Sequence, residues 1–145
     1  MANTVYNISK KIDGSLDIDT DTVKMLLISG STAPDPDHTT VSAVLAAAAE
    51  LSATGYTPGA GSADRKTLTM TVTVDNANNR VDHATNSQTW TALNSGTIRQ
   101  VLIYKHTGTN DANNVPIMCI DTATGLPLTL NGSDVTVAAE IYRIA

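Results

Sequence analysis

The sequence predicts a mainly β protein, an antiparallel β-sandwich or barrel-like domain with one short α-helix at about residues 41–52. The clearest observation is the segment Thr67–Val74, where threonine occupies every odd position and an apolar residue occupies every even one. This period of two is typical of a strand with one buried face. A second observation is the segment Val23–Ile28, which is apolar on both faces, as a central strand must be.

The N-terminal residues 1–15 are expected to form an arm or an edge strand that precedes a single β-rich domain over residues 16–145. Apolar and polar positions alternate between Tyr6 and Ile12, which predicts a short extended segment. An arm over Ala2–Lys11 could add a strand to the sheet edge of a neighbouring subunit. An ordinary edge strand within the same domain is the equally supported alternative.

The only substantial helix is expected directly after the proline-containing loop Ala33–Asp37, because proline continues neither a helix nor a sheet. Thr39 or Thr40 can cap its first turn, and Gly55 lies just beyond its end. Between them the apolar residues follow helical spacing and form one stripe, which consists of Val41, Val44, Leu45, Ala48 and Leu51.

The strand Thr67–Val74 is expected to form a hairpin with residues 80–84, because the Asn-rich turn 75–79 tolerates left-handed backbone. The apolar side chains of the first strand should then lie in the core, namely Leu68, Met70, Val72 and Val74. Its threonines should face solvent or a neighbouring subunit. Further strands are predicted over residues 88–92, 97–104, 115–121 and 126–130, and one long closing strand over residues 134–144.

Length, charge and composition bound the classes of function. A chain of 145 residues suits one domain with its own core. The net charge of -5 and the aromatic content of 3% argue against a nucleic-acid partner, because phosphates are repelled and bases find few stacking platforms. No apolar run reaches the ~20 residues of a membrane span, and the first residues do not form a signal peptide. We therefore expect a soluble protein made in the cytoplasm, with no membrane or nucleic-acid partner.

The chemistry-bearing residues do not combine into a recognisable site. Asp17, Asp19 and Asp21 have the Asp-x-Asp-x-Asp spacing with which a calcium-binding loop begins. Thr22 and Ile28, however, occupy the positions at which that loop needs glycine and glutamate. The three histidines lie in separate segments, and the lone cysteine lies in an apolar run where an inert buried thiol is expected; these residues are His38, His83, His106 and Cys119. We therefore expect no enzyme activity, no cofactor and no metal.

Five residues are candidates for contacts between subunits. Tyr6 and Ile8 belong to the possible arm, and Thr69 and Thr71 belong to the wet face of the alternating strand. Trp90 is the single tryptophan, and it should lie either in the core or at a subunit interface.

Several stretches together resemble a family of small virion structural proteins from tailed bacteriophages, namely Leu16–Leu27, Pro34–His38, Gly55–Thr57, Val74–Arg80, Thr89–Trp90 and Ile103–Gly108. The resemblance covers most of residues 16 to 110. These stretches contain strands and turns rather than active-site motifs. They therefore identify a family better than they identify a function.

The resemblance implies a capsid decoration, or cement, protein on the outer surface of the virion, made in the cytoplasm of the host bacterium. Its partner would be the major capsid protein, and it would self-associate as a homotrimer. Its mechanism would be multivalent binding that bridges neighbouring capsid subunits.

The alternative is a tail, neck or fibre-associated module. That module would contact other virion proteins or host-surface glycans through Trp90 and the loop Gly108–Asn114. Copy number separates the two readings, because a decoration protein is present in hundreds of copies per particle. A third class, a carbohydrate-active enzyme, would need paired carboxylates that face one cleft.

Overall fold

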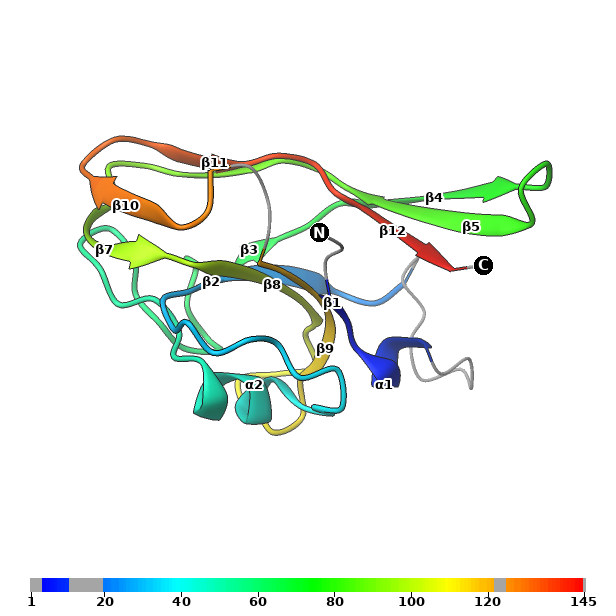
Figure 1. Cartoon of the computed structure of the whole chain (residues 1–145), viewed down its shortest axis with the longest axis horizontal. Helices are drawn as coiled ribbons and strands as arrows, with labels where there is room; N and C mark the ends of the chain where they lie inside the picture. The colour runs from blue at the N-terminus through cyan, green and yellow to red at the C-terminus, as the bar shows by residue number, and fades with distance from the viewer. Residues whose placement is uncertain (1–3, 11–19, 122–124, 145) are drawn as a thin grey trace.

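The computed structural model describes residues 4–10, 20–121 and 125–144. It confirms a mainly β, sandwich-like fold built from antiparallel sheets. Figure 1 shows a five-stranded sheet in the middle of the molecule, with smaller sheets over one face and the helices over the other.

The five-stranded sheet, called the main sheet below, has the strand order β1-β9-β8-β2-β3. Its strands are β1 (Thr4–Val5), β9 (Val115–Ile120), β8 (Gln100–Lys105), β2 (Val23–Ile28) and β3 (Lys66–Thr67). The central position predicted for residues 23–28 is confirmed. Met25 and Leu27 pack in the core on one face of β2, whereas Leu26 and Ile28 pack in a separate core on the other.

Three smaller sheets cover the first of these faces. They are the pair β10 (Leu128–Asn131) with β7 (Asn94–Ile98), the pair β11 (Val135–Val137) with β6 (Gln88–Trp90), and the sheet β12 (Ile141–Ile144), β5 (Arg80–Thr85), β4 (Met70–Asp75). The β4–β5 hairpin extends from the body at the right of Figure 1. Its turn includes Asn79, whose φ of 50° is left-handed as the sequence predicts.

Helix α2 (Val41–Ala47) covers the opposite face of the main sheet. Thr40 caps it, since its hydroxyl accepts a hydrogen bond from the Ala43 amide at 3.2 Å. The helix ends at Ala47 rather than at residue 52, because the following residues are extended and join the end of β2. There the Leu51 amide donates to the Leu27 carbonyl at 2.8 Å.

Three predicted strands are each divided between sheets. The segment 67–74 splits into β3 and β4, the segment 97–104 splits at Arg99 into β7 and β8, and the closing segment splits into β11 and β12. The Leu68 amide bonds to the Val23 carbonyl before the chain turns toward β4. The prediction that Val74 is core is wrong, because it lies where the hairpin extends past the body and is 65% exposed.

The N-terminal segment also differs from the predicted strand. Within the described residues 4–10, the strand is limited to Thr4–Val5, which pairs with β9 of the same chain as an edge strand. Residues 7–10 form the helical turn α1 (Asn7–Lys10), which lies beside the main sheet in Figure 1. Tyr6, between the two elements, is fully buried with the helix-side core.

A substitution at Leu102 can test whether the main sheet has a separate core on each face. Leu102 lies in β8 and is fully buried on the helix side. We predict that Leu102→Ala lowers the free energy of unfolding by about 2–5 kcal/mol, because it removes buried methyl groups and leaves a cavity. Urea unfolding followed by circular dichroism measures this change. The exposed Thr129 supplies a control, since Thr129→Ala should alter stability by less than about 0.5 kcal/mol. Equal losses in both variants would contradict the two-sided core.

Candidate binding site

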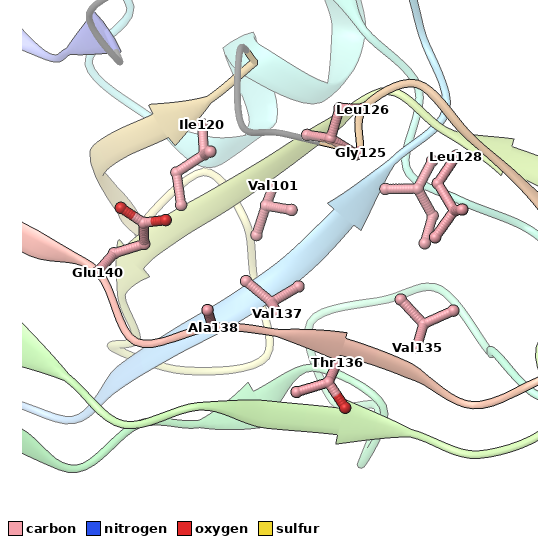
Figure 2. A pocket seen from close by; sticks show the side chains of 11 residues that line it. Val101, Ile120, Gly125, Leu126, Leu128, Val135, Thr136, Val137, Ala138 and Glu140 are labelled. Carbon is pink, nitrogen blue, oxygen red and sulfur yellow. The ribbon is translucent and has the colours of Figure 1, made fainter.

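A cavity of about 440 Å³ lies between the main sheet and the strands that cover it. Figure 2 shows Val101 of β8 and Ile120 of β9 on one side, and Val135 and Val137 of β11 on the other. The remaining lining residues come from the segment that leads into β10 and its first residue, from the end of β7, from β11 and from the stretch after β11; they are Gly125, Leu126, Leu128, Ile98, Thr136, Ala138 and Glu140. The walls are therefore mostly aliphatic.

The strand alternation of β8 explains one wall, because it directs Val101 into the cavity and Leu102 toward the helices. The break between β11 and β12 places Glu140 at the opposite wall of the cavity. Its backbone is fixed by two hydrogen bonds to Thr85 of β5, one from the Thr85 amide at 2.9 Å and one from the Glu140 amide to the Thr85 hydroxyl at 3.0 Å.

Glu140 is the one ionisable residue among the described residues that line this cavity. Its side chain is half-buried, and burial raises the pKa of its carboxyl group. A carboxylate beside aliphatic walls can accept a cation that carries an apolar group. The cavity is therefore suited to a basic and apolar ligand, such as a side chain presented by another protein.

A second cluster of charged residues centres on Arg65, whose side chain has no exposed surface, whereas the side chain of Asp111 is partly exposed. Its Nε and Nη2 donate to the two carboxylate oxygens of Glu50 at 2.9 and 2.6 Å. Its Nη1 and Nη2 donate to the two oxygens of Asp111 at 2.6 and 2.9 Å, and Nη1 also reaches the Tyr104 hydroxyl at 3.5 Å. All five guanidinium N–H groups therefore have an acceptor. We call Arg65, Glu50 and Asp111 the Arg65 cluster.

Neighbouring donors complete the cluster. Glu50 also accepts hydrogen bonds from the Tyr56 hydroxyl at 2.9 Å and from the Gly59 amide at 3.1 Å. Asp111 accepts one from the Asn114 side chain at 3.1 Å. Burial disfavours the ionised form of Asp111, but the hydrogen bonds from Arg65 and Asn114 outweigh it and lower the pKa of this carboxyl group.

The Arg65 cluster joins segments that are distant in the sequence. The loop that contains Asp111 also accepts backbone hydrogen bonds at the start of α2, from the Val41 amide to Asn114 and from the Ser42 amide to Asp111. Its role is structural, since protein donors give four hydrogen bonds to Glu50 and three to Asp111. Sequence reasoning missed these residues because they lie 15 and 46 positions apart and form no local motif.

The five predicted contact residues are not brought together. Tyr6 and Trp90 are buried in the cores of their own chain, and the Trp90 indole donates to the Asp64 carbonyl at 2.7 Å. Ile8 is half-buried against the helix-side core. Thr69 and Thr71 are exposed, as expected for the wet face of the strand.

The residues that could ligate a metal were not expected to form a site. Within the described ranges, no group of three or more His, Cys, Asp and Glu side chains could hold a metal ion. Asp17 and Asp19 lie outside the described residues, and Asp21 pairs with Lys105 at 2.9 Å. Cys119 is fully buried as predicted, and burial raises the pKa of its thiol to about 12.

Comparison of the chain with protein-family models, with curated proteins and with solved structures gives no match. No helix in the described part of the chain is long and apolar enough to cross a membrane.

The Arg65 cluster predicts an acid-sensitive contribution to stability. The folded-state pKa of Asp111 lies below the unfolded value of about 3.9. Its contribution is therefore complete above the unfolded pKa and is lost as the pH falls through the folded pKa. We predict that Asp111→Asn lowers the free energy of unfolding by about 1–3 kcal/mol at pH 7 and flattens its decline below pH ~4. Urea unfolding across this pH range is the measurement, and Asp37→Asn, at an exposed carboxylate outside the cluster, is the control.

The cavity predicts a preference for cationic over anionic small ligands. We expect hexylammonium to bind about two- to fivefold more tightly than hexanoate, because a partly exposed ion pair contributes about 0.2–1 kcal/mol. Titrations followed by NMR shifts of the Val137 and Ile120 methyl groups measure both affinities. Glu140→Gln keeps the shape of the side chain and should remove the preference. An unchanged preference in that variant would show that Glu140 does not set the charge selectivity.

Proposed function

We propose that this protein is a structural component of a tailed-bacteriophage virion that binds the outer capsid surface and bridges major capsid subunits. The observation that supports the proposal is the apolar cavity, whose described lining residues include one carboxylate, that of Glu140. The resemblance of residues 16–110 to small virion proteins supplies the context. Synthesis in the bacterial cytoplasm and assembly onto the capsid surface follow from the same proposal.

The cavity supports recognition of an apolar side chain next to a lysine or arginine on the capsid. The aliphatic walls would bury the apolar group, and Glu140 would pair with the basic one. One such contact is weak. Repeated contacts by several copies or several surfaces raise the total affinity, which is how a decoration protein stabilises a lattice.

The lining of the cavity does not fit glycoside hydrolysis, the enzyme activity considered as a third class. Glycoside hydrolysis uses two carboxyl groups about 5 to 9.5 Å apart. Among the described residues that line the cavity, Glu140 has no second carboxylate beside it.

The alternative as a glycan-binding tail module receives less support from the structure. Trp90 is 1% exposed and offers no stacking surface to a sugar. In the loop 108–114, Asn114 is buried and Asp111 is held in the Arg65 cluster. These three side chains are therefore already occupied within the chain, whereas Thr109, Asn110, Ala112 and Asn113 of the loop are exposed.

Copy number and reconstitution test the proposal. Quantitative mass spectrometry of purified virions should find hundreds of copies, and the purified protein should bind capsids that lack it. We predict that Ala138→Trp, which fills the cavity, weakens capsid binding at least about tenfold, or ~1.4 kcal/mol. Ala46→Trp is the matched control, because Ala46 is also exposed but lies on α2 at the opposite face.

Three outcomes would overturn the proposal. Absence from the virion would exclude a structural role. A few to dozens of copies per particle would indicate the tail, neck or fibre instead. Equal capsid binding by both tryptophan variants would show that the cavity is not the contact.

A further inference from the structure

Strand β4 is the outer strand of its sheet, since the order is β12-β5-β4. The Asn86 amide donates to the Thr69 carbonyl, and the register continues from there to Thr71 opposite Ala84 and Thr73 opposite Asp82. In an antiparallel pair, alternate residues bond to the neighbouring strand and the rest point away from it. The odd residues of β4 therefore bond to β5. The even residues, Met70, Val72 and Val74, direct their amides and carbonyls to the outer edge, which no strand of the described residues pairs with.

From Met70 to Val74 this edge lacks the features by which proteins protect outer strands from pairing, and Asp75 at its end is its one charged residue. Charged residues, proline and β-bulges are the usual protection, together with short length. The run Thr67–Val74 contains no charged residue, proline or glycine, and β4 pairs with β5 without a register shift. The outer strands of the main sheet, β1 and β3, have two residues each, whereas β4 has six.

We propose that β4 pairs antiparallel with β4 of a second copy of this chain, about a two-fold axis that places Val72 opposite Val72. The two three-stranded sheets then form one continuous sheet. In this register Met70 lies opposite Val74 of the second copy, and Thr71 lies opposite Thr73 of the second copy. The even residues that point outward become the hydrogen-bonded pairs, each of which exchanges two bonds.

The sequence of β4 is self-complementary about Val72, and this selects a second copy as the partner. Threonine lies on both sides of Val72 at the adjacent positions, and an apolar residue lies on both sides two positions away. The pairing brings all even side chains to one face, where Met70 covers the exposed Val74. Residues 67 to 74 are all uncharged, so they bring no like charges together across the two-fold axis.

The same symmetry makes the contact closed. A two-fold interface uses the same strand from both copies, so that no free β4 edge remains for a third. The inference stands apart from the proposed virion role. It replaces the homotrimer implied by the resemblance with a two-fold dimer as the basic unit.

Two double variants that differ only in the sign of one charge test the register. Thr71 and Thr73 are exposed, so their substitution leaves the core of the chain intact. In Thr71→Lys/Thr73→Lys, each lysine would face a lysine of the second copy. In Thr71→Glu/Thr73→Lys, each glutamate would face a lysine. Both variants place the same lysine beside Asp82 of their own β5, which controls for effects within one chain.

We expect the wild-type chain to dimerise with concentration in sedimentation velocity and light scattering. The lysine pair should raise the dimer Kd at least about tenfold, because like charges directly opposite destabilise a sheet. The glutamate–lysine variant should dimerise at least as tightly as wild type. In the dimer, hydrogen exchange at the amides of Met70, Val72 and Val74 should be slow, and it should become fast on dilution to the monomer.

The proposal is overturned by a wild-type chain that stays monomeric at 1 mM, a concentration chosen as the upper limit of the assay. It is also overturned by a trimer or other oligomer in which the Val72 amide exchanges as fast as in the monomer. Equal effects of the two double variants on the dimer Kd would exclude the register with Val72 on the axis.

Discussion

A guanidinium group without exposed surface determines how the loops of this protein lie on its main sheet. Arg65 keeps its charge in the interior only because Glu50 and Asp111 each bind it through two oxygens. Loss of one carboxylate would leave the other in place, so the expected cost is about 1–3 kcal/mol, that of unsatisfied buried donors. The position of Glu50 requires the chain to leave the helix early, and the position of Asp111 brings its loop against the start of α2. Both ends of the helix therefore depend on the same side chain.

The two faces of the main sheet are covered in different ways, and the cavity is a consequence. On the helix side, Val41, Val44 and Ala48 form a compact layer over the even residues of β2. On the other side, the cover consists of short strands from three separate sheets. Short strands leave gaps where the chain passes from one sheet to the next. The stretch between β11 and β12 is such a passage, and there Ala138 and Glu140 line the cavity instead of closing it.

The sequence predicts the strands of this fold better than it predicts the sheets to which they belong. Continuous apolar runs identify β2 and β9, and the Asn-rich turn after β4 identifies β5. A period of two is a less reliable guide to where a strand ends. It joins β7 to β8 across Arg99 and β11 to β12 across residues 138–140, because a period of two continues whether or not the strand changes partner. The Arg65 cluster could not be found in this way, since its members are distant in sequence and lie in loops. The cavity could not be predicted in this way either, because β7, β8 and β9 each contribute a single side chain to its wall. Thr69 and Thr71 were placed correctly on an exposed face because strand alternation alone decides this.

The residues that break the ordinary rules of burial mark the surfaces available to other molecules. A valine belongs in a core, and a carboxylate belongs in water. Val74 is nevertheless 65% exposed on the extended hairpin, and Glu140 stands half-buried among aliphatic side chains. Within the chain, neither arrangement adds to stability, because one exposes apolar surface and the other desolvates a charge. Both would become favourable on association, since a partner strand covers the valine and a basic apolar group neutralises the carboxylate. Local conflicts of this kind occur at functional sites. Because the hairpin edge and the cavity lie on different strands, one copy can use the first for self-association and the second for a different partner at the same time.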